Sequence, residues 1–268
     1  MRARVRALGV SVLIALVLAG AFPVIAVAWP ACDGPSGTNL FAGNARFAGG
    51  LRGVYAEIEW FNTHLCVQTG DPEWSWSMSW VSLDGPNSDQ VAGVSIFQGG
   101  FTKCAPAGTG SCPFNGGVSY HWFYYGREEG QCGAAYNSTI RKAPKGNAGP
   151  GVYDYEVSKA PDGDYHFYIN EVSQYAKAGY TIDDCWGGVG VVGVEWQNEM
   201  IDPNDQNGGT VSNHQQFFAV QYKDGSGWHS ANRPLGSLCD ANSNPASWHC
   251  GWGSTSGTFF NEWDERAP

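Results

Sequence analysis

The sequence predicts an all-β protein, a two-sheet antiparallel jelly-roll β-sandwich that is stabilised by disulfides. Three observations point to this fold class. The 268 residues include 37 glycines and 14 prolines, which favour turns. They also include 12 tryptophans, 12 tyrosines and 13 phenylalanines, which favour strands. No stretch shows a convincing helical period, so we expect short strands joined by many turns.

The strongest predicted strand covers residues 74–84. Trp74, Trp76, Met78 and Trp80 alternate with serines, so one face is aromatic and we expect the serine face to meet water. A curved sheet of such strands offers a concave groove that suits an extended chain. Seven further strands are expected: 53–60, 91–101, 118–125, 152–157, 164–170, 189–197 and 214–222.

The N-terminus is typical of an export signal. Three arginines precede an unbroken apolar run that ends near two small-residue cleavage patterns, although an uncleaved membrane anchor is the alternative. We therefore predict a signal peptide over 1–28 and a secreted chain with no membrane contact after cleavage. Residues 29–268 are expected to form a single β-sandwich domain, a monomer, with loop-rich flanks at 29–52 and 236–268.

Charge argues against nucleic acid as a partner. Removal of 1–28 takes away three arginines and no acid, so the formal net charge changes from −10 to −13. A phosphate backbone is attracted by clustered basic residues, and the lysines and arginines here are scattered.

The eight cysteines all lie within 29–268, and none forms a C-x-x-C pair. Four disulfides are expected, and short Gly/Pro-rich loops favour the pairs Cys104–Cys112 and Cys239–Cys250. Neither the cysteines nor the six dispersed histidines have the spacing of a metal site. We expect no metal and no cofactor.

Three segments each place a polar residue in a predicted strand: WVSLDG at 80–85, SIFQGG at 95–100 and GVEWQNEM at 193–200. In the last, Glu195 is flanked by Val194 and Trp196, which point the opposite way. A carboxyl group on a partly dry face is suited to general acid–base catalysis. The amide of Gln98 could donate to a developing oxyanion, so Glu195 and Gln98 could activate one water.

At these residues the sequence resembles the glutamic peptidases of the eqolisin family, and it is also similar to the neprosin family, whose sandwich is related. Both suggest a concanavalin A-like fold. The resemblance implies that Glu195 is the general base and then the general acid, while Gln98 orients the water and stabilises the oxyanion. Trp80 and Asp84 would be supporting residues. It also implies a glutamic-type endopeptidase that cleaves an extended polypeptide at acid pH.

The sequence departs from these families at several positions. Tyr124 stands where eqolisins carry a glutamate, Ser82 replaces a glycine, and neprosins have a glutamate at the place of Gln98. On the concave face, Trp76, Tyr124 and Trp196 are expected to line the substrate groove.

Two other functions remain open from the sequence. A glycoside hydrolase would need two carboxylates, for which Glu195 and Glu199 are the candidates. A non-catalytic carbohydrate-binding or cell-surface module on the same fold would bind a glycan in place of a polypeptide. In that case aromatic residues would stack on sugar rings, among them Trp74, Trp76, Tyr124 and Tyr125.

Overall fold

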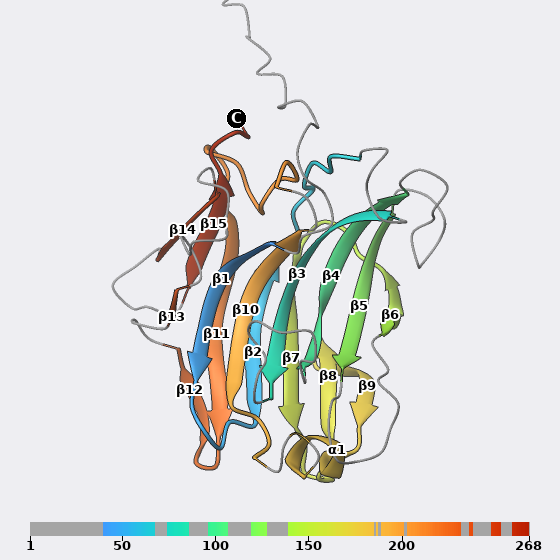
Figure 1. Cartoon of the computed structure of the whole chain (residues 1–268), viewed down its shortest axis with the longest axis vertical. Coiled ribbons are helices and arrows are strands. Elements are labelled where there is room, and N and C mark those ends of the chain that lie inside the picture. Colours follow the sequence, from blue (N-terminus) through green and yellow to red (C-terminus); the bar gives the residue numbers. More distant parts are fainter. Residues whose placement is uncertain are drawn as a thin grey trace, which may run out of the picture.

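The computed structural model is a sandwich of two antiparallel β-sheets (Figure 1). Within the described residues the only helix is α1 (Gly179–Asp183). The structure describes residues 40–67, 74–85, 96–106, 119–127, 139–184, 186, 189–200, 203–231, 236–237, 248–252 and 259–267.

The sheet that lies in front in Figure 1, here called the front sheet, has the order β13-β1-β10-β3-β4-β5-β6. Its strands are β1 (Leu40–Phe47), β3 (Trp74–Asp84), β4 (Ile96–Pro106), β5 (Ser119–Arg127), β6 (Thr139–Asn147), β10 (Gly193–Met200) and β13 (Gly236–Ser237).

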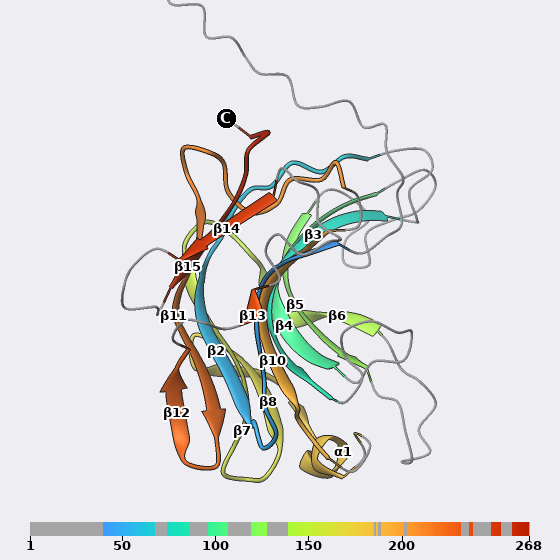
Figure 2. The ribbon, with the colours of Figure 1, turned by 60° about the vertical axis from the view of Figure 1, so that its left-hand side comes forward.

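The second sheet, here called the back sheet, has the order β14-β15-β11-β2-β7-β8-β9, and β12 pairs with β11. Figure 2 shows the two curved sheets packed face to face. The strands are β2 (Gly53–Glu59), β7 (Val152–Lys159), β8 (Tyr165–Ile169), β9 (Val172–Lys177), β11 (Gln215–Asp224), β12 (Gly227–Ser230), β14 (Trp248–Trp252) and β15 (Phe260–Asp264).

The main hydrophobic core fills the space between the two sheets. The front sheet contributes alternate residues of its central strands, and the back sheet contributes alternate residues of β2, β7, β8 and β11. Because side chains alternate along a strand, the residues between these core positions lie on the outer faces. Core residues include Val54, Ile58, Val81, Leu83, Phe97, Phe167, Val194 and Phe217.

The predicted sandwich is confirmed, but some strand positions differ from the sequence expectation. The strand at 74–84 matches β3, whereas β4 extends five residues beyond the end of the predicted 91–101, whose first five residues lie outside the described residues. The flank 29–52, expected as loop, contains β1, and the flank 236–268 contains β13, β14 and β15. β1 lies between two strands and is buried on both faces, so it lacks the alternation that marks a half-exposed strand.

The expectation that the serine face of β3 meets water is wrong. Ser75, Ser77 and Ser79 are buried and point toward the back sheet. Ser79 Oγ donates to Asn198 Oδ1, and Gln215 Nε2 donates to Ser79 Oγ at 3.0 Å. Buried amides therefore replace water as partners of the Ser79 hydroxyl, and Asp205 Oδ2 accepts from Ser75 Oγ at 3.4 Å, so these buried hydroxyls keep hydrogen-bond partners.

Other expectations fall largely outside the described residues, as does the predicted signal peptide at 1–28. Cys66, Cys104 and Cys250 carry no free thiol. The pairs Cys104–Cys112 and Cys239–Cys250 remain predictions, because Cys112 and Cys239 are not described. In the part of the chain that is described, no helix is long and apolar enough to cross a membrane.

Candidate active site

Glu195 and Gln98 lie on the same outer face of the front sheet. Glu195 of β10 is paired with Ser82 of β3, and Ser82 is paired with Gln98 of β4. Directly paired residues of neighbouring strands share a face, so the three form one row across the sheet. With strands about 4.8 Å apart, the Cα atoms of Glu195 and Gln98 are roughly 9.6 Å apart.

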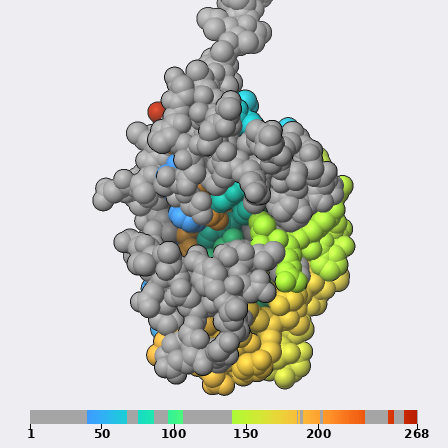
Figure 3. Space-filling model, turned by 45° about the vertical axis from the view of Figure 1, so that its right-hand side comes forward, coloured from blue at the N-terminus to red at the C-terminus, as the bar shows by residue number. Residues whose placement is uncertain are grey.

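The row is shielded from water. Glu195 is 8% exposed, Gln98 is 6% exposed and Ser82 is fully buried. In Figure 3 the surface is hollowed over part of this face, where the blue and teal segments come into view. A carboxyl group in such a place exchanges protons in a partly dry environment, where its electrostatic interactions are stronger than in water.

A second amide lies beside the carboxylate. Gln197 occupies the same face two residues further along β10, and its Nε2 donates to Glu195 Oε2 at 2.6 Å. The opposite oxygen of the amide, Gln197 Oε1, is buried and has no hydrogen-bond partner within the described residues. The row and Gln197 together therefore contain one carboxylate, two amides and one buried acceptor, Gln197 Oε1, that has no partner within the described residues.

The supporting residues predicted from sequence lie next to this row. Trp80 is paired with Gln197, and its Nε1 donates to Glu199 Oε2 at 3.1 Å. Asp84 accepts a hydrogen bond from Ser82 Oγ at 2.8 Å. Trp80 thus orients the second glutamate of β10, while Asp84 orients the hydroxyl that separates Glu195 from Gln98.

An aromatic and aliphatic cluster forms the rest of this face. Trp76, Met78, Trp80 and Cys104 pack together on the outer side of the front sheet. Phe41 of β1 meets Trp80 edge to face, with ring centroids 6.5 Å apart. The cluster keeps the neighbouring row dry and holds the Trp80 ring in place.

The expected groove residues have different outcomes. Trp196 was predicted to line the groove, and this is wrong: it is 0% exposed, packs between the sheets and donates from Nε1 to the Tyr55 carbonyl at 2.8 Å. It points inward because it alternates with Glu195 on the strand. Trp76 lies on the predicted face but is buried. The side chain of Tyr124 lies outside the described residues, although its backbone pairs with Gly99.

Gln197 is the site residue that sequence reasoning missed. The signal was present in GVEWQNEM, where Glu195, Gln197 and Glu199 alternate and must share a face in any extended strand. In the described part of the chain, no three His, Cys, Asp or Glu side chains gather as metal ligands.

No protein-family model matches the chain, and no curated protein matches its sequence. Two solved peptidases are similar in structure. Scytalido-glutamic peptidase, solved with a peptide-based transition-state analogue, is 13% identical over 87% of this chain and 100% of the other, with a TM-score of 0.48. SCP-B, an eqolisin solved with the tripeptide Ala-Ile-His, is 12% identical over the same shares, with a TM-score of 0.47.

A third solved structure is similar over less of its length. β-Agarase A from Zobellia galactanivorans is 8% identical over 82% of this chain and 68% of its own, with a TM-score of 0.28. At 13% and 12% identity, the resemblance to the two glutamic peptidases is remote.

Proposed function

We propose that the chain is a secreted hydrolase that cleaves polypeptides at acid pH, with Glu195 and Gln98 activating one water. The observation that carries the proposal is the row Glu195–Ser82–Gln98, which puts a carboxylate and an amide on one dry face. Only the small Ser82 side chain stands between them in the row, and the proposal places the water and the peptide carbonyl over it.

In this mechanism Glu195 removes a proton from the water as its oxygen attacks the peptide carbonyl carbon. The amide N–H of Gln98 donates to the oxyanion that forms on the carbonyl oxygen. As the C–N bond breaks, Glu195 returns the proton to the leaving amine. Gln197 holds Glu195 Oε2 and so keeps the carboxylate aimed at the row.

The carbohydrate-binding alternative finds less support on this face. Aromatic side chains that stack on sugars need an exposed ring face. Trp76 is 7% exposed and Trp80 is 1% exposed, and both are packed within the cluster. The described aromatic residues here act as packing and offer no platform.

The test is hydrolysis of a denatured protein by the purified chain from about pH 2 to about pH 8, with Glu195→Gln and Glu199→Gln compared. The second variant is the matched control, since it removes a carboxylate from the same strand and face but leaves an oxygen to accept from Trp80. We expect Glu195→Gln to lose at least 100-fold in kcat, on the order of a general-base contribution, and Glu199→Gln to lose far less. Equal activity of Glu195→Gln and the unmodified chain would exclude the mechanism.

A further inference from the structure

A separate pocket of about 500 Å³ opens where β2 ends. Glu59 is the last residue of β2 and follows the core residue Ile58, so its side chain points to the outer face of the back sheet. Glu59 and the row that holds Glu195 therefore lie on opposite outer faces of the sandwich. Its volume is within the range of small-molecule sites.

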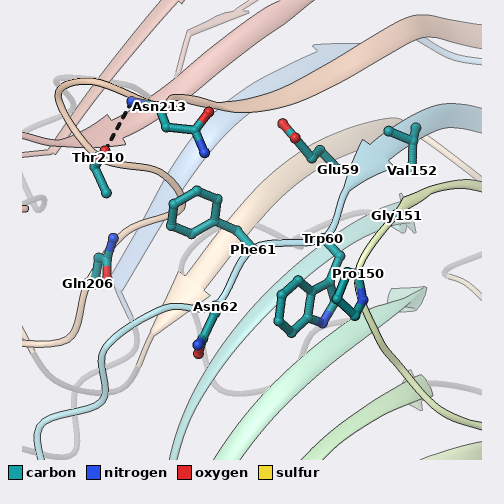
Figure 4. Close-up of a pocket in the computed structure, with 10 residues that line it drawn as sticks. All are labelled: Glu59, Trp60, Phe61, Asn62, Pro150, Gly151, Val152, Gln206, Thr210 and Asn213. Atoms are coloured by element: carbon teal, nitrogen blue, oxygen red, sulfur yellow. Dashed lines mark hydrogen bonds between the residues drawn. The ribbon is translucent and has the colours of Figure 1, made fainter.

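Figure 4 shows how the side chains surround this space. Glu59 and Asn213 lie at its upper side, and the Phe61 ring lies below them. The Trp60 ring lies beside Pro150 on the other side. Backbone contacts hold these walls together, because Trp60 N donates to the Gly151 carbonyl at 2.8 Å.

Glu59 is a carboxylate without a counter-ion in the described part of the chain. Burial raises the pKa of its carboxyl group, and only a backbone hydrogen bond from Gln216 opposes that shift. No described lysine, arginine or histidine forms an ion pair with it. Lys103 extends toward the adjacent segment but donates to Asn62 Oδ1 at 3.0 Å and to the Thr63 carbonyl. An opposite charge within about 4–6 Å of this carboxylate would favour its ionised form.

The walls suit a cation carried on an apolar stem. Trp60 and Phe61 are half-buried rings, and an ammonium or guanidinium group is attracted to the face of such rings. Pro150 and Val152, which is 47% exposed, supply aliphatic surface beside them. Methylene groups of a long basic side chain can pack on that surface while the charged end reaches the carboxylate.

A neutral sugar is a poorer fit because most amides of the pocket are already used. Gln206 Oε1 accepts from His64 N at 2.8 Å, and Gln206 Nε2 donates to the Gly209 carbonyl at 2.8 Å. Asn62 is bound to Lys103. Sugar hydroxyls would find few hydrogen-bond partners here, whereas a single cation needs mainly the carboxylate and the rings.

We propose that this pocket binds a lysine or arginine side chain of a partner polypeptide, with the charged group at Glu59 and the stem against Trp60 and Phe61. The net charge of −10 favours the approach of basic partners in general. The proposal does not depend on the hydrolase activity proposed above.

The test is an NMR titration of the whole purified chain with the methylamides of Nα-acetyl-lysine and Nα-acetyl-arginine. The norleucine analogue has a similar stem without the charge and is the ligand control. The indole N–H signal of Trp60, assigned with Trp60→Phe, is the readout. We expect saturable shifts with the cationic ligands in the millimolar range and much weaker ones with norleucine.

Glu59→Gln should weaken binding of the cationic ligands at least tenfold. Glu57→Gln is the matched control, since Glu57 lies on the same face of β2 but outside the pocket, and it should bind as the unmodified chain does. Circular dichroism checks that both variants fold. Equal binding of norleucine, equal binding by Glu59→Gln, no binding in the millimolar range, or Trp60 shifts with methyl glucoside alone would each overturn the proposal.

Discussion

The amide nitrogen of Gln197 donates a hydrogen bond of 2.6 Å to Glu195 Oε2, so two residues of one strand face form a single polar unit. Strand β10 lies between β1 and β3 and is buried along its full length. The pair is therefore built on a rigid element, which is the arrangement that precise positioning of a reacting group requires.

Replacing Gln197 with leucine should impair hydrolysis without unfolding the chain. The donor that stabilises ionised Glu195 is lost, so the acid side of the rate–pH profile should move to higher pH. On the acid side of the profile we expect kcat to fall about tenfold, which corresponds to a loss of roughly 1.4 kcal/mol of transition-state stabilisation. Gln197→Glu is not a suitable control because it adds a charge, whereas Gln197→Asn shortens the same amide and should give an intermediate profile. A profile unchanged in Gln197→Leu would contradict this role.

Enlarging Ser82 should close the gap between the two proposed catalytic residues. The side chain is fully buried between Glu195 and Gln98, and valine adds a methyl group there and removes the hydrogen bond to Asp84. We expect Ser82→Val to lose at least tenfold in kcat, while Ser82→Gly should keep or raise it at a stability cost of about 1 kcal/mol. Steady-state kinetics measures the change in kcat, and urea unfolding measures the change in stability separately. Full activity of Ser82→Val would show that the gap is not used.

Gly99 allows the two sheets to approach next to Gln98. A Cβ at this position would overlap the ring of Phe167 in the back sheet. We expect Gly99→Ala to destabilise the fold by about 1–3 kcal/mol, because the core cannot absorb the added atom. Gly49→Ala is the control, since nothing lies within 4 Å of its added Cβ. Urea unfolding midpoints of the two variants are compared. Equal midpoints would refute the predicted destabilisation by Gly99→Ala.

Glu262 should make the fold more stable at acid pH than at neutral pH. It is fully buried in the sandwich, and burial raises the pKa of its carboxyl group well above 4.5 despite the hydrogen bond from Asn198 Nδ2 at 2.6 Å. The folded state therefore binds this proton more tightly than the unfolded state does. The resulting stabilisation is complete below the ordinary pKa of 4.5 and is lost as the pH rises through the raised one.

Glu262→Gln keeps an acceptor for Asn198 but cannot ionise. We expect its free energy of unfolding to change less between acid and neutral pH than that of the unmodified chain, as measured by urea unfolding. Glu171→Gln, at an exposed turn, should leave the pH dependence unaltered. A pH dependence in Glu262→Gln as steep as in the unmodified chain would assign the effect to other groups.

Local alternation predicts much of this protein. The period of two in 74–84 identified β3 at both its ends, and the same period in GVEWQNEM implied that Glu195 and Trp196 face opposite ways. Strands without alternation were not predictable by this signal. β1 is buried on both faces, and it lies in a flank that the sequence predicted to be loop-rich.

The sequence by itself determined the fold class and which residues of each strand share a face, because side-chain direction in a strand depends only on position along the chain. The tertiary structure alone decided which face is the interior and which strands are neighbours. It turned Ser75, Ser77 and Ser79 of β3 inward, where Asn198, 119 residues from Ser79, accepts the hydrogen bond of the Ser79 hydroxyl. It also set Glu195 in one row with Gln98, since strand pairing joins distant segments through backbone hydrogen bonds that carry no local sequence signal.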